Sequence, residues 1–242
     1  MKFISTTFEG PDKMLLPLLW KDIRLNKYVI LLTVFFVDTP YLTTALGLSA
    51  FTGEPEDNTP LTERLSIAFP FSLLFLAIVS AFIGGYPITA EKAERTDRFL
   101  DYLPPTRLQV VTSKVLIALS LLLLAWIGPA IVYFEYVRPT AVGGMMREGS
   151  RFLILYALST SLILFGLAWL ASLYIRSSTL CGLAAFVGWL AVLIIVRRVS
   201  FALRHGHTDN AHMVDGLFWV AIGIVVSSLV AGILLFLRTP SD

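Results

Sequence analysis

Residues 84–114, GGYPITAEKAERTDRFLDYLPPTRLQVVTSK, form the longest charged stretch between two long apolar segments of this chain. Two acid–base pairs, Glu91 with Arg95 and Glu94 with Arg98, are each spaced by four residues with the acid first. This spacing and order stabilise a helix, because both side chains of a pair lie on one face. The stretch therefore predicts a short helix outside the apolar segments that flank it.

An apolar and aromatic patch follows the two pairs, and a double proline ends it. Pro104 and Pro105 predict the end of the helix, because proline has no backbone N–H and its ring clashes with the preceding turn. Aromatic side chains in a charged segment favour contact with a partner protein or with lipid headgroups over a purely solvated connector. We therefore predict a docking helix over residues 91–103. Its patch comprises Phe99, Leu100, Tyr102 and Leu103.

The composition indicates that most of the chain is surrounded by lipid. Its 242 residues are 56% hydrophobic and 15% charged, whereas a soluble domain carries about 25% charged residues. The mean hydropathy is +0.77. A formal net charge of +2 is too small to indicate a nucleic acid as partner. The single cysteine, Cys181, excludes an intramolecular disulfide.

Six apolar segments are long enough to cross the bilayer, which takes about 20 helical residues for about 30 Å of hydrocarbon. Before the first of them, residues 12–27 place leucines on one side and basic residues on the other, with Trp20 at headgroup level. The sequence predicts an all-α polytopic membrane protein with this N-terminal interfacial helix, in one transmembrane domain over residues 1–242. The predicted spans are 28–50, 67–88, 110–137, 152–175, 179–196 and 214–237.

The first span contains an acidic residue near its middle, Asp38, followed by Thr39 and Pro40. An ionised Asp at the centre of a span costs about 2.5–3.5 kcal/mol on insertion, and such residues usually face a bundle interior or a wet cavity. Pro40 removes a backbone hydrogen bond and kinks the helix. Two interpretations stay open: a polar break that lines a transport pathway, or a protonated Asp that packs one helix against another.

The basic residues set the orientation. With six spans, both termini share one side with the loops after the second and fourth spans, and that side holds twelve of the nineteen Lys and Arg residues. Cytoplasmic loops carry the excess of Lys and Arg. We therefore expect a multi-pass protein of the cell (inner) membrane with both termini, and residues 84–114, in the cytoplasm.

The layout resembles the permease subunits of type-2 ATP-binding-cassette exporters. That family has a basic amphipathic helix before the first span, as in LLWKDIRLNK here, and a cytoplasmic coupling helix with an acidic start after the second. A Leu-Pro-x-[Ser/Thr]-Arg turn and a lysine then open the third span. The glycine that usually follows the Glu-Arg pair is replaced here by Thr96. The matching residues are Glu91, Glu94 and Arg95, then Leu103, Pro104, Pro105, Thr106 and Arg107, then Lys114.

The resemblance implies a homo- or heterodimer of six-span subunits, each docked on a separate ATPase. ATP and Mg²⁺ belong to that partner, because this chain has no GxxxxGK[ST] phosphate loop. We accordingly expect no catalytic, cofactor-binding or metal-binding residues here. The turn at residues 176–178 matches a second, smaller family contact. The residues implied to contact the ATPase are Glu91, Glu94, Arg95, Arg98, Phe99, Tyr102, Leu103 and Arg107.

Three other functions compete with this interpretation. A proton-coupled secondary transporter could use Asp38, although no repeated halves are visible. An intramembrane protease is a second alternative, because Glu91 and Arg95 fit a Glu-x-x-x-Arg spacing. It is disfavoured, because such an enzyme would need histidines inside the spans and none lies there. A structural anchor is the third. The few polar residues in the spans favour export of an apolar or amphipathic substrate.

A loop rich in histidine precedes the last span. Its residue types suit a metal, but we interpret it as a polar connector. The residues concerned are His205, His207, Asp209 and His212.

Overall fold

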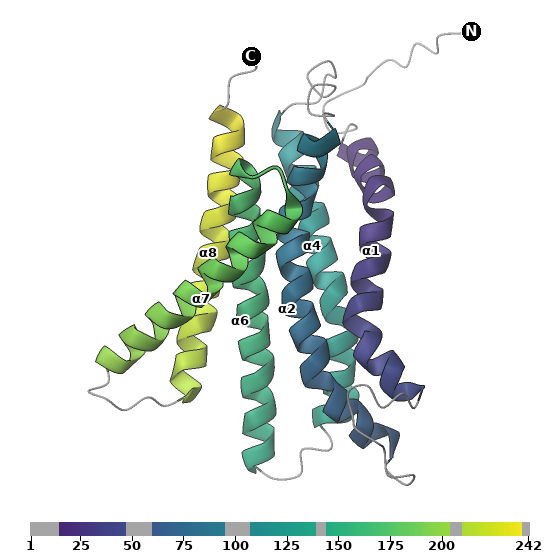
Figure 1. Ribbon diagram of the computed structural model, residues 1–242, viewed down its shortest axis with the longest axis vertical. Coiled ribbons are helices and arrows are strands. Elements are labelled where there is room, and N and C mark those ends of the chain that lie inside the picture. The colour runs from purple at the N-terminus through teal and green to yellow at the C-terminus, as the bar shows by residue number, and fades with distance from the viewer. Residues whose placement is uncertain (1–14, 47–59, 95–106, 139–143, 204–209, 239–242) are drawn as a thin grey trace.

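The computed structural model describes residues 15–46, 60–94, 107–138, 144–203 and 210–238. Within these ranges the chain is helical apart from short connections (Figure 1). The elements are α1 (Leu15–Ala45), α2 (Leu61–Glu94), α4 (Arg107–Val132), a π-helical turn (Tyr133–Val137), α6 (Gly144–Tyr174), α7 (Ser178–Leu203) and α8 (Asn210–Arg238).

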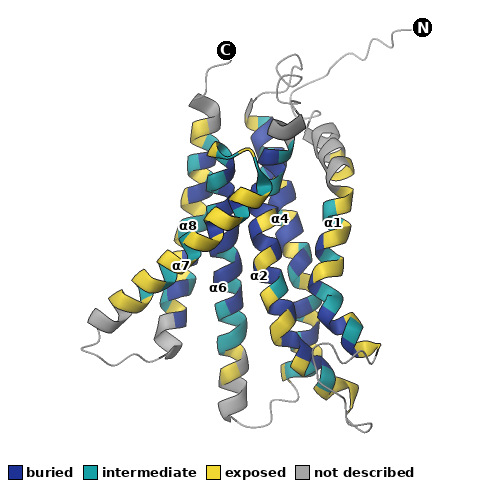
Figure 2. Cartoon of the chain, in the orientation of Figure 1, coloured by how far each residue is buried: buried dark blue, intermediate teal, exposed yellow. Residues whose placement is uncertain are grey.

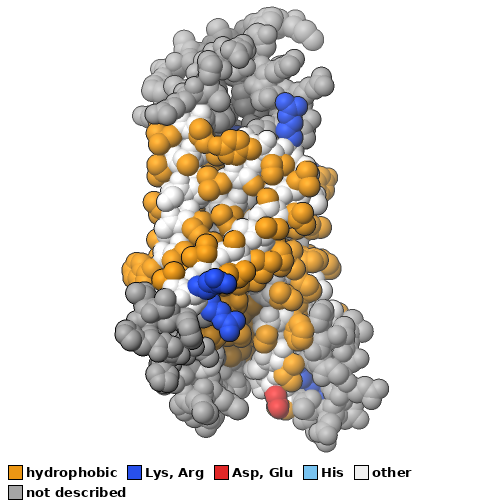
Figure 3. All heavy atoms as spheres, turned by 60° about the vertical axis from the view of Figure 1, so that its left-hand side comes forward, with side chains coloured by type: hydrophobic (Ala, Val, Ile, Leu, Met, Phe, Trp, Pro, Cys, Tyr) orange, Lys and Arg blue, Asp and Glu red, His pale blue; other side chains and the backbone are white. Residues whose placement is uncertain are grey.

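Among the described residues, six helices are long and apolar enough to span a membrane, as the sequence predicts. The hydrocarbon provides no hydrogen-bond partners, so a spanning segment must bond its own backbone, and a helix does so completely. Figure 3 shows one face of the molecule, where hydrophobic side chains cover most of the described surface and few charged ones interrupt them. The spanning portions are Lys27–Ala45, Leu61–Ala90, Leu108–Val137, Arg151–Tyr174, Ser178–Val199 and Val214–Leu235.

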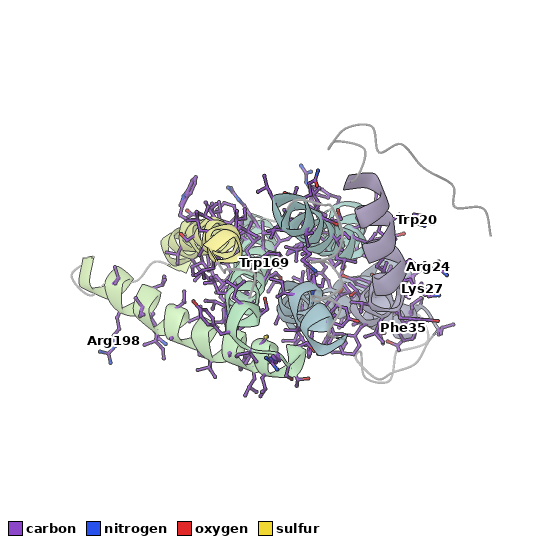
Figure 4. All side chains as sticks on the ribbon, turned by 90° about the horizontal axis from the view of Figure 1, so that it is seen from above. Trp20, Arg24, Lys27, Phe35, Trp169 and Arg198 are labelled. Atoms are coloured by element: carbon purple, nitrogen blue, oxygen red, sulfur yellow. The ribbon has the colours of Figure 1, made fainter. Side chains whose placement is uncertain are left out.

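The predicted interfacial segment and the first span form one helix in the structure. α1 has no break at residue 27 or 28, where the two predicted elements meet. In the view from above, the side chains of Trp20, Arg24 and Lys27 lie along its outer side (Figure 4), and Trp20 is exposed. The helix therefore carries its basic residues directly into the first span without a hinge in the described backbone.

α2 is longer than its predicted span. Gly84, Gly85 and Pro87 predict a loosened end, yet the helix continues through them to Glu94. The reason is packing: a Cβ on Gly84 would collide with the backbone carbonyl of Phe165 on α6, and one on Gly85 would lie 3.0 Å from Cβ of Cys181 on α7. The two glycines allow close helix contact, which fixes the end of α2 instead of loosening it.

The core lies around α2 and α6. Burial colours their facing sides dark blue along much of their length (Figure 2). The most deeply buried large side chains include Phe69, Leu76 and Ile83 of α2, with Phe165 and Trp169 of α6. Since lipid is as apolar as these side chains, close van der Waals packing holds the helices together in place of a hydrophobic driving force.

Small residues on the last two helices also face α6. Gly232 of α8 would bring a Cβ to 2.5 Å from the indole nitrogen of Trp169, and Gly188 of α7 would bring one to 2.9 Å from Leu167. Trp169 lies beside α8 in the view from above (Figure 4). Ser228 is buried with Gly232, whereas Ala184 is exposed. A small-residue contact with α6 is therefore formed by Ser228 and Gly232 on α8 and by Gly188 on α7.

α7 crosses the bundle obliquely and leaves it. Figures 1 and 4 both show its start against the other helices and its far end, marked by Arg198, directed away from them. In its spanning portion 17% of the residues are buried, against 61% for α2. The exposed side of α7 therefore faces lipid or another protein.

The turn between α6 and α7 is as tight as the sequence predicts. The Ile175 N–H bonds the Ala171 carbonyl at 2.8 Å, and the Cys181 N–H bonds the Ser177 carbonyl at 3.0 Å. This turn lies at the same end of the molecule as the end of α2, the start of α4 and the described start of α1 (Figure 1). These segments are the ones that the orientation argument places together.

Replacing Gly84 by alanine is expected to destabilise the protein. The added methyl group overlaps the rigid backbone of α6, and overpacking of this kind costs about 1–3 kcal/mol. At roughly 2–4 °C per kcal/mol for a chain of this size, thermal unfolding in detergent should fall by several degrees. Gly223→Ala in α8 is the control, because a Cβ added at Gly223 would meet no side chain or neighbouring helix within 4 Å. Equal melting temperatures for the two variants would contradict the close contact.

Candidate functional site

The structure places Asp38 between helices. Asp38 lies on α1, half-buried, and its carboxylate packs against the backbone of α4 at Gly128. A Cβ at Gly128 would overlap a carboxylate oxygen, so a larger residue there would force the Asp38 side chain out of its present position. Gly128 precedes the buried Pro129, and the π-helical turn begins four residues later. Single π-helical turns often mark functional sites.

The other two candidate pathway residues of the first span are Thr39 and Pro40. Hydroxyl groups near Pro40 donate hydrogen bonds to backbone carbonyls of α1. The Thr39 hydroxyl donates to the Phe35 carbonyl at 2.6 Å, and the Thr44 hydroxyl donates to the Pro40 carbonyl at 2.7 Å. Pro40 is itself buried. These hydroxyl groups add hydrogen bonds to backbone carbonyls in the turns on both sides of Pro40, which cannot itself donate one.

Two further polar residues join this site. Ser72 of α2 is fully buried, and its hydroxyl donates to the Val37 carbonyl of α1 at 2.8 Å. Tyr41 is buried on α1, about one turn after Asp38. Among the described residues, the Tyr41 hydroxyl has no hydrogen-bond partner that meets ordinary geometry.

We name the residues Asp38, Tyr41, Ser72 and Gly128 the three-helix polar site. It combines a carboxyl group and a phenol hydroxyl where α1, α2 and α4 meet, inside the spanning portions. Such groups can hold helices together, take up and release a proton, or bind a polar atom of a passing molecule. The sequence singles out Asp38 by its charge, but the other three are ordinary residue types for a span and become visible only through contact.

A second polar contact joins the helices on either side of the predicted docking helix. Lys114 of α4 is 4% exposed, and its ammonium donates to the Pro87 carbonyl of α2 at 3.1 Å. In the same turns of α2, the buried Thr89 hydroxyl donates to the Gly85 carbonyl at 2.9 Å. Lys114 therefore ties the end of α2 to the start of α4. The sequence alone indicates only that Lys114 is a basic residue near the start of the third span.

Three of the predicted ATPase-contacting residues lie at the ends of described helices, next to residues 95–106, which the structure does not describe. Glu91 and Glu94 lie in the last turn of α2, and Arg107 is the first residue of α4. The structure thus extends α2 into the first turn of the predicted docking helix. The remaining predicted contacts lie outside the described residues: Arg95, Arg98, Phe99, Tyr102 and Leu103.

The structure brings together no metal site within the ranges that it describes, where no three His, Cys, Asp or Glu residues cluster. The predicted histidine-rich connector is only partly covered. His205, His207 and Asp209 lie outside the described residues, and His212 lies in the first turn of α8.

Comparison of the chain with protein-family models, with curated proteins and with solved structures finds no match.

The contact between Asp38 and Gly128 can be tested by a double-mutant cycle. Gly128→Ala alone should lower the melting temperature, because its methyl group collides with the Asp38 carboxylate and overpacking costs about 1–3 kcal/mol. In an Asp38→Ala background the same change should cost less than about 1 kcal/mol, since truncation removes the three atoms nearest to the methyl group. Contacting residues show coupling of about 0.5–3 kcal/mol in such cycles. Additive melting temperatures would contradict the contact.

Proposed function

We propose that this chain is the membrane-spanning permease subunit of an ATP-binding-cassette exporter. In this proposal a separate ATPase subunit binds ATP and Mg²⁺, a second permease subunit completes the dimer, and the cargo is apolar or amphipathic. The protein lies in the cell membrane with both termini in the cytoplasm. The six apolar helices support a multi-pass membrane protein. The resemblance in residues 11–27 and 82–114 supports the exporter class.

One observation carries the proposal: the two spanning helices that flank the docking segment are bonded to each other close to their described ends. α2 runs without a break from Leu61 in its span to Glu94, and α4 resumes at Arg107. Lys114 fastens the two helices to each other close to those ends. A partner that displaces the segment between Glu94 and Arg107 would therefore move both helices together, which a freely solvated loop could not achieve.

Movement of α2 would spread through the bundle. Ser72 bonds α2 to α1, and Gly84 and Gly85 bring it against α6 and α7. Small-residue contacts and packed interfaces shift as units because they cannot deform continuously. In the proposed cycle, closure of the ATPases on ATP tilts α2 and α4 and rearranges the helices around the cargo.

A proton-coupled transporter is the second candidate. The half-buried position of Asp38 in the three-helix polar site favours it, because acidic residues inside spans often relay protons. This candidate needs no ATPase partner. Association with an ATPase through the docking segment therefore separates the two candidates.

The double variant Phe99→Asp with Tyr102→Asp should weaken binding of the partner ATP-binding-cassette ATPase that this proposal requires. Buried aromatic residues at interface centres contribute about 2 kcal/mol or more, so binding should weaken at least about thirtyfold. Co-expression, affinity capture of the permease and quantification of the ATPase provide the measurement.

Gly149→Asp is the control for that experiment. Gly149 is exposed near the start of α6, outside the spanning portion of that helix and at the opposite end of α6 from the turn before α7. It should leave capture unchanged. Undiminished capture with the double variant, in protein that inserts normally, would overturn the docking assignment.

A further inference from the structure

One face of α1 is left uncovered by the rest of the described chain. α1 lies at the edge of the bundle and packs against α2 and α4 (Figure 1). In its spanning portion 28% of the residues are buried, against 61% for α2. In the view from above, four labelled side chains of α1 lie along its outer side (Figure 4): Trp20, Arg24, Lys27 and Phe35. This side of α1 is therefore open to the surroundings of the protein.

Five exposed residues define the outer face of α1. Their spacing of three or four residues places them on one side of the helix. The first three combine two cations with a tryptophan, whereas the last two are apolar and lie inside the spanning portion that begins at Lys27. The face thus divides along its length into a charged end and an apolar end, as a phospholipid does. The five residues are Trp20, Arg24, Lys27, Leu31 and Phe35.

The charged end lies where the hydrocarbon begins. Arg24 precedes the spanning portion by about one turn, and Lys27 is the first residue of that portion. The Lys27 ammonium lies 4.8 Å from the centroid of the Tyr28 ring, a cation–π contact that holds the charge at this level. Tryptophan and tyrosine are enriched at membrane–water interfaces, and Trp20 and Tyr28 are both exposed. Two positive charges and two amphipathic rings therefore lie together at headgroup depth.

The apolar end has the length of one lipid tail region. Phe35 follows Arg24 by eleven residues, which at 1.5 Å per residue is about 17 Å along the helix. One leaflet contributes about half of the roughly 30 Å hydrocarbon core. Leu31 and Phe35 are 66% and 63% exposed. An acyl chain can therefore lie against them while its headgroup stays beside Arg24.

The charge balance of this region favours an anionic headgroup. Residues 13–27 contain four Lys and Arg residues and one acidic residue. Basic clusters next to a span attract anionic lipids, and each basic residue near the surface strengthens the interaction about fivefold. A zwitterionic headgroup has no net charge and so gains much less from the same residues.

A second copy of this chain fits the outer face less well. Two copies with the same membrane orientation bring residues of equal depth together, and a twofold interface places a surface against itself. Arg24 and Lys27 of one copy would then meet the same residues of the other, and none of the five residues of the face is acidic. Like charges brought together cost free energy. An anionic headgroup neutralises these charges instead.

We infer that the outer face of α1 binds an anionic phospholipid, such as phosphatidylglycerol. The phosphate accepts charge-assisted hydrogen bonds from the Arg24 guanidinium and the Lys27 ammonium, and an acyl chain lies against Leu31 and Phe35. The inference requires the chain to span a membrane and does not rest on the proposed ATPase partner.

Quenching of tryptophan fluorescence by brominated lipid tests the inference in reconstituted vesicles. Trp20 reports on the outer face of α1. Trp219 of α8 is the matched reporter, because it is also 69% exposed but an exposed acid, Asp215, lies one turn before it. The variants Trp219→Phe and Trp20→Phe each keep one of the two reporters, and the variant with both changes gives the background of the other tryptophans. The vesicles contain equal amounts of phosphatidylglycerol and phosphatidylcholine, with bromine on the chains of one or the other.

We expect brominated phosphatidylglycerol to quench Trp20 more than brominated phosphatidylcholine does, and the two lipids to quench Trp219 alike. Two basic residues predict a preference of about thirtyfold at Trp20. Arg24→Gln should lower it about fivefold, and Arg24→Gln with Lys27→Gln should lower it to the value at Trp219. Both side chains are exposed, so these variants should fold normally. Arg151→Gln, at an exposed position on α6, removes a positive charge elsewhere and should leave the preference at Trp20 unchanged.

Equal quenching of Trp20 by the two lipids, the same preference at both reporters, or a preference that survives the double Gln variant would overturn the inference. Absence of quenching by either lipid would also overturn it, because protein would then cover the face. The vesicles contain neither ATP nor an ATPase. Failure here therefore leaves the docking proposal standing, and failure of the docking experiment leaves the lipid result standing.

Discussion

The bilayer requires every backbone polar group in a span to find a partner inside the protein, and four prolines within the helices make this demanding. Pro40 lies in α1, Pro70 and Pro87 in α2, and Pro129 in α4. Each removes one backbone donor and loosens the turn before it. Side chains add hydrogen bonds to backbone carbonyls near two of these prolines: the Thr39 and Thr44 hydroxyls near Pro40, and the Thr89 hydroxyl and the Lys114 ammonium near Pro87.

Two side-chain hydrogen bonds near these prolines also join one helix to another. The Ser72 hydroxyl reaches from α2 to the Val37 carbonyl beside Pro40, and Lys114 reaches from α4 to the Pro87 carbonyl itself. Side-chain hydrogen bonds across helices contribute about 0.6 kcal/mol on average in membrane proteins. They are too weak to hold the bundle alone, but together with the glycine contacts of α2 they fix its position. In the proposed mechanism α2 is the helix through which force enters, and it packs against α1, α4, α6 and α7.

The spans and the turn after α6 are predictable because they depend on local signals: apolar runs of bilayer length, and an Arg-Ser-Ser interruption between two of them. The failures arise where a residue's role depends on a distant neighbour. Gly84 and Gly85 indicate flexibility in isolation but permit close contact once α6 and α7 lie against them. Lys114 marks a membrane boundary in the sequence, yet in the structure it is buried and its ammonium donates to the Pro87 carbonyl of α2.

The candidate sites show the same division. Asp38 stands out because a charge within a span is costly, whereas its neighbours Tyr41 and Ser72 resemble any polar residue in a helix until their contacts are known. The basic residues and the tryptophan on the outer face of α1 are visible in the sequence, but the exposure of that face depends on which side of α1 packs against α2 and α4. In a span both sides of a helix are apolar, so periodicity does not show which side a neighbouring helix covers.

The sidedness of residues 95–106 tests the central claim most directly, because an ATPase can act on them only from the cytoplasm. Cys181 is the only cysteine and is buried, so the wild-type chain should not react with a maleimide. Asp97→Cys reports on the docking segment, and Gly149→Cys, an exposed position at the opposite end of α6, reports on the other side. With a membrane-impermeant maleimide, we predict labelling at position 149 in intact cells and at position 97 only after permeabilisation. Labelling at position 97 in intact cells would contradict the account.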